Sequence, residues 1–278
     1  MRGACRVGLN SHMDEIAKYN VERWRRLVEA GALYTRPLLN LDAASARGVV
    51  DPRGWLGELA GRRVLCLAGG GGRESAAFAL LGARVTVFDL SEEQLGQDRR
   101  AAAHYGLEVE TVRGDMRDLS ALDGAGFDIV WHPYSLNFVP DARAVFREVA
   151  RVVRRGGLYR LMCANPFVMG AGTKDWDGRG YALAHAYVDG AEVTGADEEW
   201  VYERAGRGAI RPPREYRHGL GTLVGGLAGE DFRIVRALED ESLHLSPNAE
   251  PGTWDHFVSI VRPWLTFLSR YDPGAFAG

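Results

Sequence analysis

The sequence predicts an α/β fold in which helices cover both faces of a doubly wound, mostly parallel sheet. Short apolar runs of strand length alternate with helical patterns between residues 62 and 163, and such alternation is typical of a parallel sheet covered on both faces. The first run leads directly into four glycines, residues 69–72, which open a helix. The 278 residues, of which 46% are apolar and 26% charged, are enough to bury a sizeable core.

The expected elements follow from this periodicity and from the residues that begin or end them. Ser91 and Asp141 are placed to cap their helices. Residues 1–10 lack periodicity and are expected to have no fixed structure, and residues 32–60 are expected to form a linker. Helices are expected over residues 14–31, 73–81, 91–105, 141–155 and 222–229. Strands are expected over residues 62–68, 84–88, 107–112, 127–131, 158–163 and 232–238.

The glycine turn and the acid that follows the next strand form the clearest candidate binding motif. Gly70, Gly72 and Ser75 have a spacing close to the dinucleotide-binding fingerprint. Glycines let a ligand approach the backbone closely, and the helix N-terminus behind them favours an anion. Asp89 lies at the tip of the second strand, where its carboxylate can accept hydrogen bonds from both hydroxyls of a ribose. An ordinary buried strand–helix–strand unit is the alternative, but four consecutive glycines favour a nucleoside ligand.

Three more side chains follow the ends of expected strands. Asp115 could bond an adenine amino group, or it could cap a turn, and its position alone does not separate these roles. Met116 could cover the adenine ring. His132 directly follows the fourth strand. Because ligands of parallel sheets bind beyond the carboxyl ends of the strands, these residues are expected to lie around one cleft.

Composition and charge exclude several classes of protein. The net charge of −3 argues against a non-specific nucleic-acid binder, and no apolar run is long enough to span a membrane. No signal-peptide pattern opens the sequence. Cys5, Cys66 and Cys163 share no metal-ligand spacing and are interpreted as core residues. We therefore expect a cytoplasmic protein without a metal site.

Five ordered segments resemble the motifs of class I S-adenosylmethionine-dependent methyltransferases. The similarity is closest to the small-molecule branch typified by ubiquinone- and menaquinone-biosynthesis-like enzymes. These segments are residues 68–72, 87–91, 114–116, 127–130 and 151–157. The resemblance implies a Rossmann-like methyltransferase fold with a seven-stranded sheet. It also implies S-adenosyl-L-methionine as cofactor and S-adenosyl-L-homocysteine as product.

The resemblance also implies cofactor roles for the residues at the strand ends. The glycine turn would hold the methionine part, Asp89 the ribose and Asp115 the adenine amino group, while Leu90 and Met116 would flank the adenine. The turn reads Ala-Gly-Gly-Gly-Gly instead of the commoner Gly-x-Gly-x-Gly, which leaves open which N–H faces the cofactor. The full expected cofactor set is Ala68, Gly69, Gly70, Gly71, Asp89, Leu90, Gly114, Asp115, Met116 and His132.

The remaining segments are expected to complete the domain and to bind the substrate. Residues 14–163 and 215–245 would form the cofactor-binding domain. Residues 164–214, which are long, aromatic and glycine-rich, would form an inserted substrate cap or a small packed subdomain. Residues 246–278 would form an aromatic C-terminal extension that packs on the domain or on a partner subunit. The candidate substrate-binding residues are Tyr134, Asn137, Asn165, Phe167 and Tyr216.

The favoured function is transfer of a methyl group to a small-molecule acceptor by in-line displacement. His132 or His218 is the candidate group to position or deprotonate the acceptor, because a neutral imidazole accepts protons near neutral pH. A nicotinamide-dependent oxidoreductase is one alternative, although no Tyr-x-x-x-Lys pair is recognisable. A non-catalytic nucleoside-binding regulatory module is another. The protein is expected to act as a monomer or homodimer, without nucleic acid or membrane, on an oxygen, nitrogen, sulfur or carbon acceptor.

Overall fold

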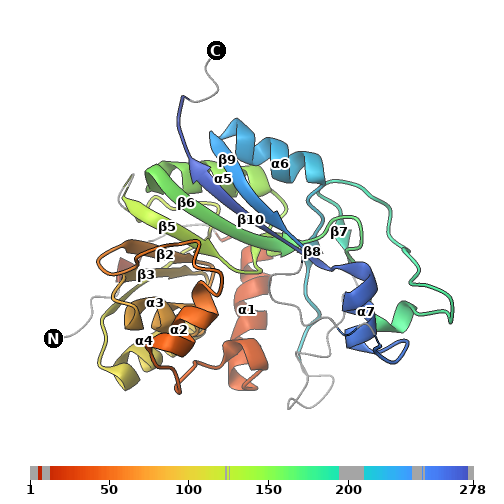
Figure 1. The fold of residues 1–278 in the computed structure, drawn as a ribbon, viewed down its shortest axis with the longest axis horizontal. Coiled ribbons are helices and arrows are strands. Elements are labelled where there is room, and N and C mark those ends of the chain that lie inside the picture. Colours follow the sequence, from red (N-terminus) through yellow and green to blue (C-terminus); the bar gives the residue numbers. More distant parts are fainter. Residues whose placement is uncertain are drawn as a thin grey trace.

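The fold is organised around one twisted sheet (Figure 1). The computed structural model describes residues 6–7, 13–122, 124, 126–193, 210–239, 246 and 248–274. Within these ranges the sheet has eight strands in the order β1-β4-β3-β2-β5-β6-β10-β9. The strands are β1 (Arg6–Val7), β2 (Arg63–Leu67), β3 (Arg84–Asp89), β4 (Val109–Arg113), β5 (Phe127–His132), β6 (Val153–Ala164), β9 (Phe232–Leu238) and β10 (Trp264–Tyr271). A separate pair is formed by β7 (Glu192–Val193) and β8 (Glu215–Tyr216).

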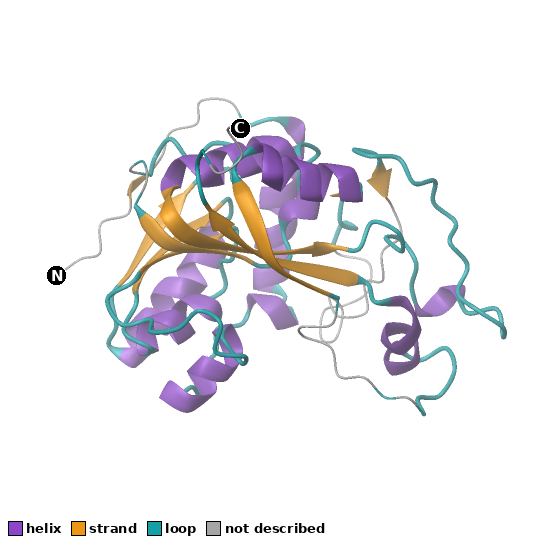
Figure 2. Ribbon diagram, turned by 45° about the horizontal axis from the view of Figure 1, so that its top comes forward, coloured by secondary structure: helices purple, strands orange, loops and turns teal. Residues whose placement is uncertain are grey.

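Helices cover both faces of the sheet, which confirms the predicted fold class (Figure 2). The described helices are α1 (Glu15–Glu29), α2 (Ala43–Val50), α3 (Glu74–Leu80), α4 (Glu92–Tyr105), α5 (Ala142–Val152), α6 (Leu220–Gly229) and α7 (Trp254–Val261). The two predicted caps are present: Ser91 accepts a hydrogen bond from the backbone N–H of Gln94, and Asp141 accepts one from that of Ala144. Within the described ranges, no helix is both long and apolar enough to cross a membrane.

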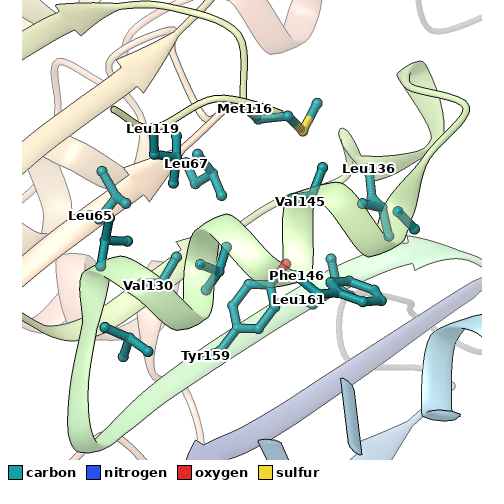
Figure 3. Packing of buried hydrophobic residues seen from close by; sticks show 14 of the residues in the cluster. Leu65, Leu67, Met116, Leu119, Val130, Leu136, Val145, Phe146, Tyr159 and Leu161 are labelled. Carbon is teal, nitrogen blue, oxygen red and sulfur yellow. The ribbon is translucent and has the colours of Figure 1, made fainter. Parts of the chain in front are cut away.

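The alternation of β2 explains why the sheet needs two helical layers. Val64 and Cys66 point to the core formed with α2, α3 and α4, whereas Leu65 and Leu67 point to the core formed with α5 and α6. Figure 3 shows the second core, where Phe146 of α5 packs near the residues of the central strands. The sheet is therefore buried on both faces, and only its edges and strand ends are available to a ligand.

The C-terminal segment differs most from expectation. Within the expected extension, residues 246–278, the stretch Trp264–Tyr271 forms β10, which pairs antiparallel with both β6 and β9. This strand is inside the sheet because its apolar residues serve both cores: Leu265 and Phe267 face one, and Leu268 faces the other. β10 completes the seven strands of the expected sheet, to which the two-residue β1 adds an edge.

Two N-terminal expectations are corrected. Residues 6–7 were expected to lack structure, but they pair in parallel with Val112 and Arg113 of β4. The expected linker of residues 32–60 contains α2, whose N-terminus is a capping box between Asp42 and Ser45. This helix is short and begins with small residues, so it lacks the apolar period that identifies longer helices.

Residues 164–193, which were expected to form part of a cap, lie beyond the carboxyl ends of the strands, next to α7 (Figure 1). Val168, Ala171 and Tyr181 pack against the buried face of α7, which belongs to the C-terminal segment. Tyr181 also shares a 2.7 Å hydrogen bond with Nδ1 of His256. The expected cap of residues 164–214 is therefore joined by α7, while its residues 194–209 lie outside the described part.

Candidate active site

A cavity of about 800 Å³ lies at the carboxyl ends of β2 to β6. Its walls come from the turns after these strands, from α1 on one side, and from the cap and α7 on the other. This is the position at which open α/β sheets bind their ligands. Of the ten expected cofactor residues, eight line it: Ala68, Gly69, Gly70, Asp89, Leu90, Gly114, Asp115 and Met116.

Asp89 anchors the first half of the glycine turn. Its Oδ2 accepts a 2.9 Å hydrogen bond from the backbone N–H of Gly70, and its Oδ1 accepts one of 2.9 Å from Ser91. Burial raises the pKa of this carboxyl, although the backbone hydrogen bonds oppose the shift. Each carboxylate oxygen can accept a second hydrogen bond, so the carboxylate keeps the acceptor capacity that the expected ribose contact requires.

The turn itself is a strained and closely packed piece of backbone. Ala68 has a positive φ of 46°, which is costly for a residue with a Cβ. A Cβ on Gly69 would lie 3.1 Å from Pro133 after β5, and one on Gly70 would lie 2.7 Å from Cβ of Gln94 on α4. The glycines therefore let the turn fit between two neighbouring elements.

Gly71 has a different role from the one expected. It does not line the cavity, because its N–H donates to Oδ2 of Asp98 at 2.9 Å. Asp98 lies on α4, is fully buried, and was not among the expected site residues. The departure from Gly-x-Gly-x-Gly is thereby clarified: the second half of the turn faces α4, and the first half faces the cavity.

Asp115 lines the cavity and also stabilises its own turn. Its Oδ1 accepts a 2.9 Å hydrogen bond from the backbone N–H of Arg117, and Nη2 of Arg117 lies 2.6 Å from its Oδ2. Arg117 also pairs with Asp14, the N-cap of α1, at 2.7 Å. The two interpretations of Asp115 are therefore compatible, and the turn is tied to the helix that forms one wall of the cavity.

Neither candidate histidine reaches the cavity. His132 is fully buried, and its Nδ1 shares a 2.9 Å hydrogen bond with the Tyr159 hydroxyl. Burial and nearby Arg160 lower its pKa to about 3. Nε2 of His218 lies 3.2 Å from the carbonyl oxygen of Leu136, and burial lowers the pKa of this imidazole as well. The expected catalytic role of both histidines, and the expected cofactor contact of His132, therefore stay predictions that this packing does not favour.

The burial of His132 predicts how the free energy of unfolding depends on pH. Its imidazole is neutral in the folded protein but protonates in the unfolded chain below its usual pKa of 6.5. Protons therefore favour unfolding as the pH falls through that value. We expect the stability advantage of the wild type over His132→Asn to shrink by about 2 kcal/mol between pH 7 and pH 5. Urea unfolding at both pH values measures it, and an advantage that stays constant would contradict the neutral histidine.

Of the five candidate substrate residues, only Tyr134 lines the cavity. Asn137 instead clamps the backbone, accepting from Ala164 N–H and donating to Tyr216 O. Asn165 donates to the carbonyl of Arg262 in the loop before β10. Phe167 is 55% exposed and stacks on Tyr187, while Tyr216 is buried outside the lining.

A residue that sequence reasoning missed faces Tyr134. The Tyr134 hydroxyl donates a 3.0 Å hydrogen bond to Oε1 of Glu215, which is 5% exposed and lines the same cavity. Burial and the carboxylate of Glu215 raise the pKa of Tyr134 well above its usual value, so the phenol stays neutral. Phe138 and Trp264 lie against the Tyr134 ring, with centroid distances of 6.2 Å and 6.5 Å.

Part of the chain is similar to known methyltransferases. Residues 65–161 match a methyltransferase domain family. An uncharacterized methyltransferase, YbaJ of Bacillus subtilis (strain 168), is 36% identical over 166 residues, which cover 56% of this chain and 65% of that protein. A ubiquinone biosynthesis O-methyltransferase of Xanthomonas euvesicatoria pv. vesicatoria (strain 85-10) is 37% identical over 108 residues, or 39% of this chain and 45% of that protein. The chain thus spans less than two thirds of the length of these curated relatives.

Solved structures share the fold. An S-adenosylmethionine-dependent methyltransferase from Mesorhizobium loti has a TM-score of 0.57 at 22% identity, covering 84% of this chain and 100% of its own. Geranyl diphosphate C-methyltransferase from Streptomyces coelicolor A3(2) has a TM-score of 0.52 at 16% identity, and the match covers 95% of this chain and 86% of that protein. A nicotinamide-dependent oxidoreductase is not favoured by these similarities. In its fold, and over residues 65–161 in its sequence, the chain is therefore similar to S-adenosylmethionine-dependent methyltransferases.

Proposed function

We propose that this protein transfers the methyl group of S-adenosylmethionine to a small-molecule acceptor. The observation that carries the proposal is that the nucleoside-binding features and a buried acid–phenol pair line one cavity. When bound, S-adenosylmethionine supplies an electrophilic methyl group on a sulfonium sulfur, and this sulfur becomes a neutral thioether when the methyl group is transferred. The protein then needs mainly to align the acceptor and exclude water.

The residues around the turn fit this cofactor. We infer that Asp89 holds the ribose hydroxyls, that Leu90 and Met116 enclose the adenine, and that Gly69 and Gly70 face the methionine part. Oε1 of Gln94 supports the assignment, because this buried atom has no hydrogen-bond partner among the described residues and its side chain lines the cavity. A bound ligand with a donor group would satisfy it.

The acceptor is proposed to lie between the glycine turn and the cap. Aromatic and sulfur-containing side chains line the cavity, which favours an acceptor with an apolar body. They include Phe138, Met162, Met169, Trp254 and Trp264. Glu215 would take the proton of a hydroxyl or amine acceptor, while the acceptor lone pair forms the new bond to the methyl carbon and the C–S electrons stay on sulfur. Tyr134 would orient the carboxylate through its hydrogen bond.

We place this activity in the cytoplasm. Cys66 and Cys163 are free and buried, as expected for thiols in a reducing compartment. Burial raises the pKa of both thiols, which favours a core role over a reactive one.

Calorimetric titration with S-adenosylmethionine and, separately, with NAD tests the cofactor. We expect binding of the first alone. A panel of hydroxyl, amine, thiol and activated-carbon acceptors, assayed by release of S-adenosylhomocysteine, then tests turnover. Binding without turnover of any acceptor would support the non-catalytic module, and binding of NAD alone would contradict the proposal.

Glu215→Gln is expected to lower kcat by roughly 100-fold or more for a hydroxyl or amine acceptor, because the amide cannot accept the proton. The affinity for S-adenosylmethionine should not change. Glu192→Gln is a matched control, since Glu192 lies on β7 beside β8 and pairs with Arg214 instead of Tyr134. Equal rates for Glu215→Gln and the wild type would exclude Glu215 as the base.

A further inference from the structure

A buried acid on α4 receives three hydrogen bonds from the glycine turn and the helix that follows it. The carboxylate of Asp98 accepts from Gly71 N–H at 2.9 Å, from Gly72 N–H at 3.0 Å and from the Ser75 hydroxyl at 2.5 Å. We propose that Asp98 is a positioning residue for the cofactor: its ionised carboxylate holds the second half of the turn against α4, so that the first half faces the ligand. This inference rests on the proposed function, because it takes S-adenosylmethionine as the ligand of the turn.

The geometry requires a carboxylate at this place. Three donors converge on two oxygens, and charge-assisted hydrogen bonds of this kind are roughly twice as strong as neutral ones. An amide offers only one acceptor oxygen, and its NH₂ group would face a donor. Gly71 and Gly72 have φ of 122° and 73°, so this backbone conformation has to be held by something outside it.

The turn has little room to find another arrangement. A Cβ on Gly72 would lie 2.6 Å from the carbonyl oxygen of Gln97 on α4 and 2.9 Å from Cβ of Pro37. The turn thus packs closely between α4 and the segment before α2, and the Asp98 carboxylate accepts the hydrogen bonds of its N–H groups. Asp98 does not line the cavity, so it acts on the ligand only through the turn.

The same burial makes this contact sensitive to pH. Desolvation, together with the nearby charge of Asp89, raises the pKa of Asp98 to about 7, against the effect of its three hydrogen bonds. The charge of Asp98 also acts on the Cys66 thiol of β2, whose pKa is raised mainly by burial. Asp98 therefore loses its charge as the pH falls through about 7, and its hydrogen bonds to the three donors are then no longer charge-assisted.

This protonation is expected to loosen the turn without unfolding the protein. The folded state binds the proton of Asp98 more tightly than the unfolded chain does, so acid stabilises the fold through this group. Ligand affinity and global stability should consequently respond to pH in opposite directions through Asp98. A purely structural role would move both together.

Calorimetric titration with S-adenosylmethionine and S-adenosylhomocysteine, from about pH 5.5 to about pH 8.5, tests the inference against thermal melting at each pH. In the wild type, both affinities should fall as the pH drops below about 7. Asp98→Asn should bind both ligands roughly tenfold or more weakly at high pH, and should lose this pH dependence. If the ligand affinity of Asp98→Asn still falls at lower pH, we assign that fall to Asp89, because burial also raises the pKa of its carboxyl.

Two further variants sharpen the result. Ser75→Ala removes one donor to the carboxylate, so the midpoint of the affinity profile should move to higher pH. Glu92→Gln changes a half-exposed acid of the same helix and should reproduce the wild-type profile. The inference is overturned if the wild-type affinity shows no pH dependence, if Asp98→Asn binds like the wild type, or if only S-adenosylmethionine shows the dependence. A wild type that binds neither ligand at any pH would instead reject the proposed function.

Discussion

Replacing Asp89 with alanine is expected to weaken S-adenosylmethionine binding by roughly 10- to 100-fold. The variant loses the proposed hydrogen bonds to the ribose, and a hydrogen bond to a charged group contributes about 1.5–3 kcal/mol. It also leaves the N–H groups of Gly70 and Ser91 without their acceptor, so the turn is less well held. The affinity should therefore fall further than loss of the ribose contacts alone would produce.

Calorimetry at about pH 8, above the pKa of about 7 of Asp98, measures this loss. Ser91→Ala is the matched control: it removes the cap of α4, which accepts from Gln94 N–H, without removing a cavity-lining side chain. The control should lose about 1 kcal/mol of stability and keep its affinity. Wild-type affinity in the Asp89 variant would place the ribose elsewhere.

The expected cofactor residues that line the cavity are those whose position is fixed by the backbone. Ala68, Asp89 and Gly114 lie where strands end, and the topology of a parallel sheet brings those ends together whatever the side chains do. Eight of the ten expected cofactor residues line the cavity for this reason. The seventh strand of the sheet was harder to predict, because β10 is buried on both faces and carries no alternation that separates it from an aromatic tail.

The expected site residues that do not line the cavity differ from those that do in the direction of the side chain. Successive side chains of a strand point to opposite faces, so Trp131 lines the cavity while its neighbour His132 enters the core and meets Tyr159. In the same way, Glu215 of β8 lines the cavity, whereas the side chain of its neighbour Tyr216 does not. The sequence favoured His132 and Tyr216 for their chemistry, but their neighbours Trp131 and Glu215 are the residues that line the cavity.

Asp98 was missed for a different reason, although the sequence contains a signal for it. Charged residues in helices usually face solvent, and Asp98 belongs to a helix rich in them. It lies three residues after Leu95 and three before Ala101, both fully buried, and this spacing places all three on one face of α4. An acid on the apolar face of the helix beside a glycine turn is a sign of a buried polar contact.

Gly70→Val is expected to abolish cofactor binding. Gly70 does not have a positive φ, so the cause is not backbone strain. Its Cβ would lie 2.7 Å from Cβ of Gln94 and 3.0 Å from Oδ2 of Asp89, which would push the turn away from α4 and displace the carboxylate. Overpacking of this kind costs typically 1–3 kcal/mol, so the melting temperature should fall while the protein remains folded.

The matched control is Gly96→Ala, on the same helix as Gln94. A Cβ on Gly96 would meet only the end of the Arg99 side chain at 3.8 Å, and alanine is the better helix former by roughly 1 kcal/mol. This variant should melt at a higher temperature and bind S-adenosylmethionine like the wild type. Calorimetry and thermal melting of both variants separate the effect of the turn from that of α4. If Gly70→Val bound the cofactor with unchanged affinity, the turn would not be the surface on which the cofactor lies.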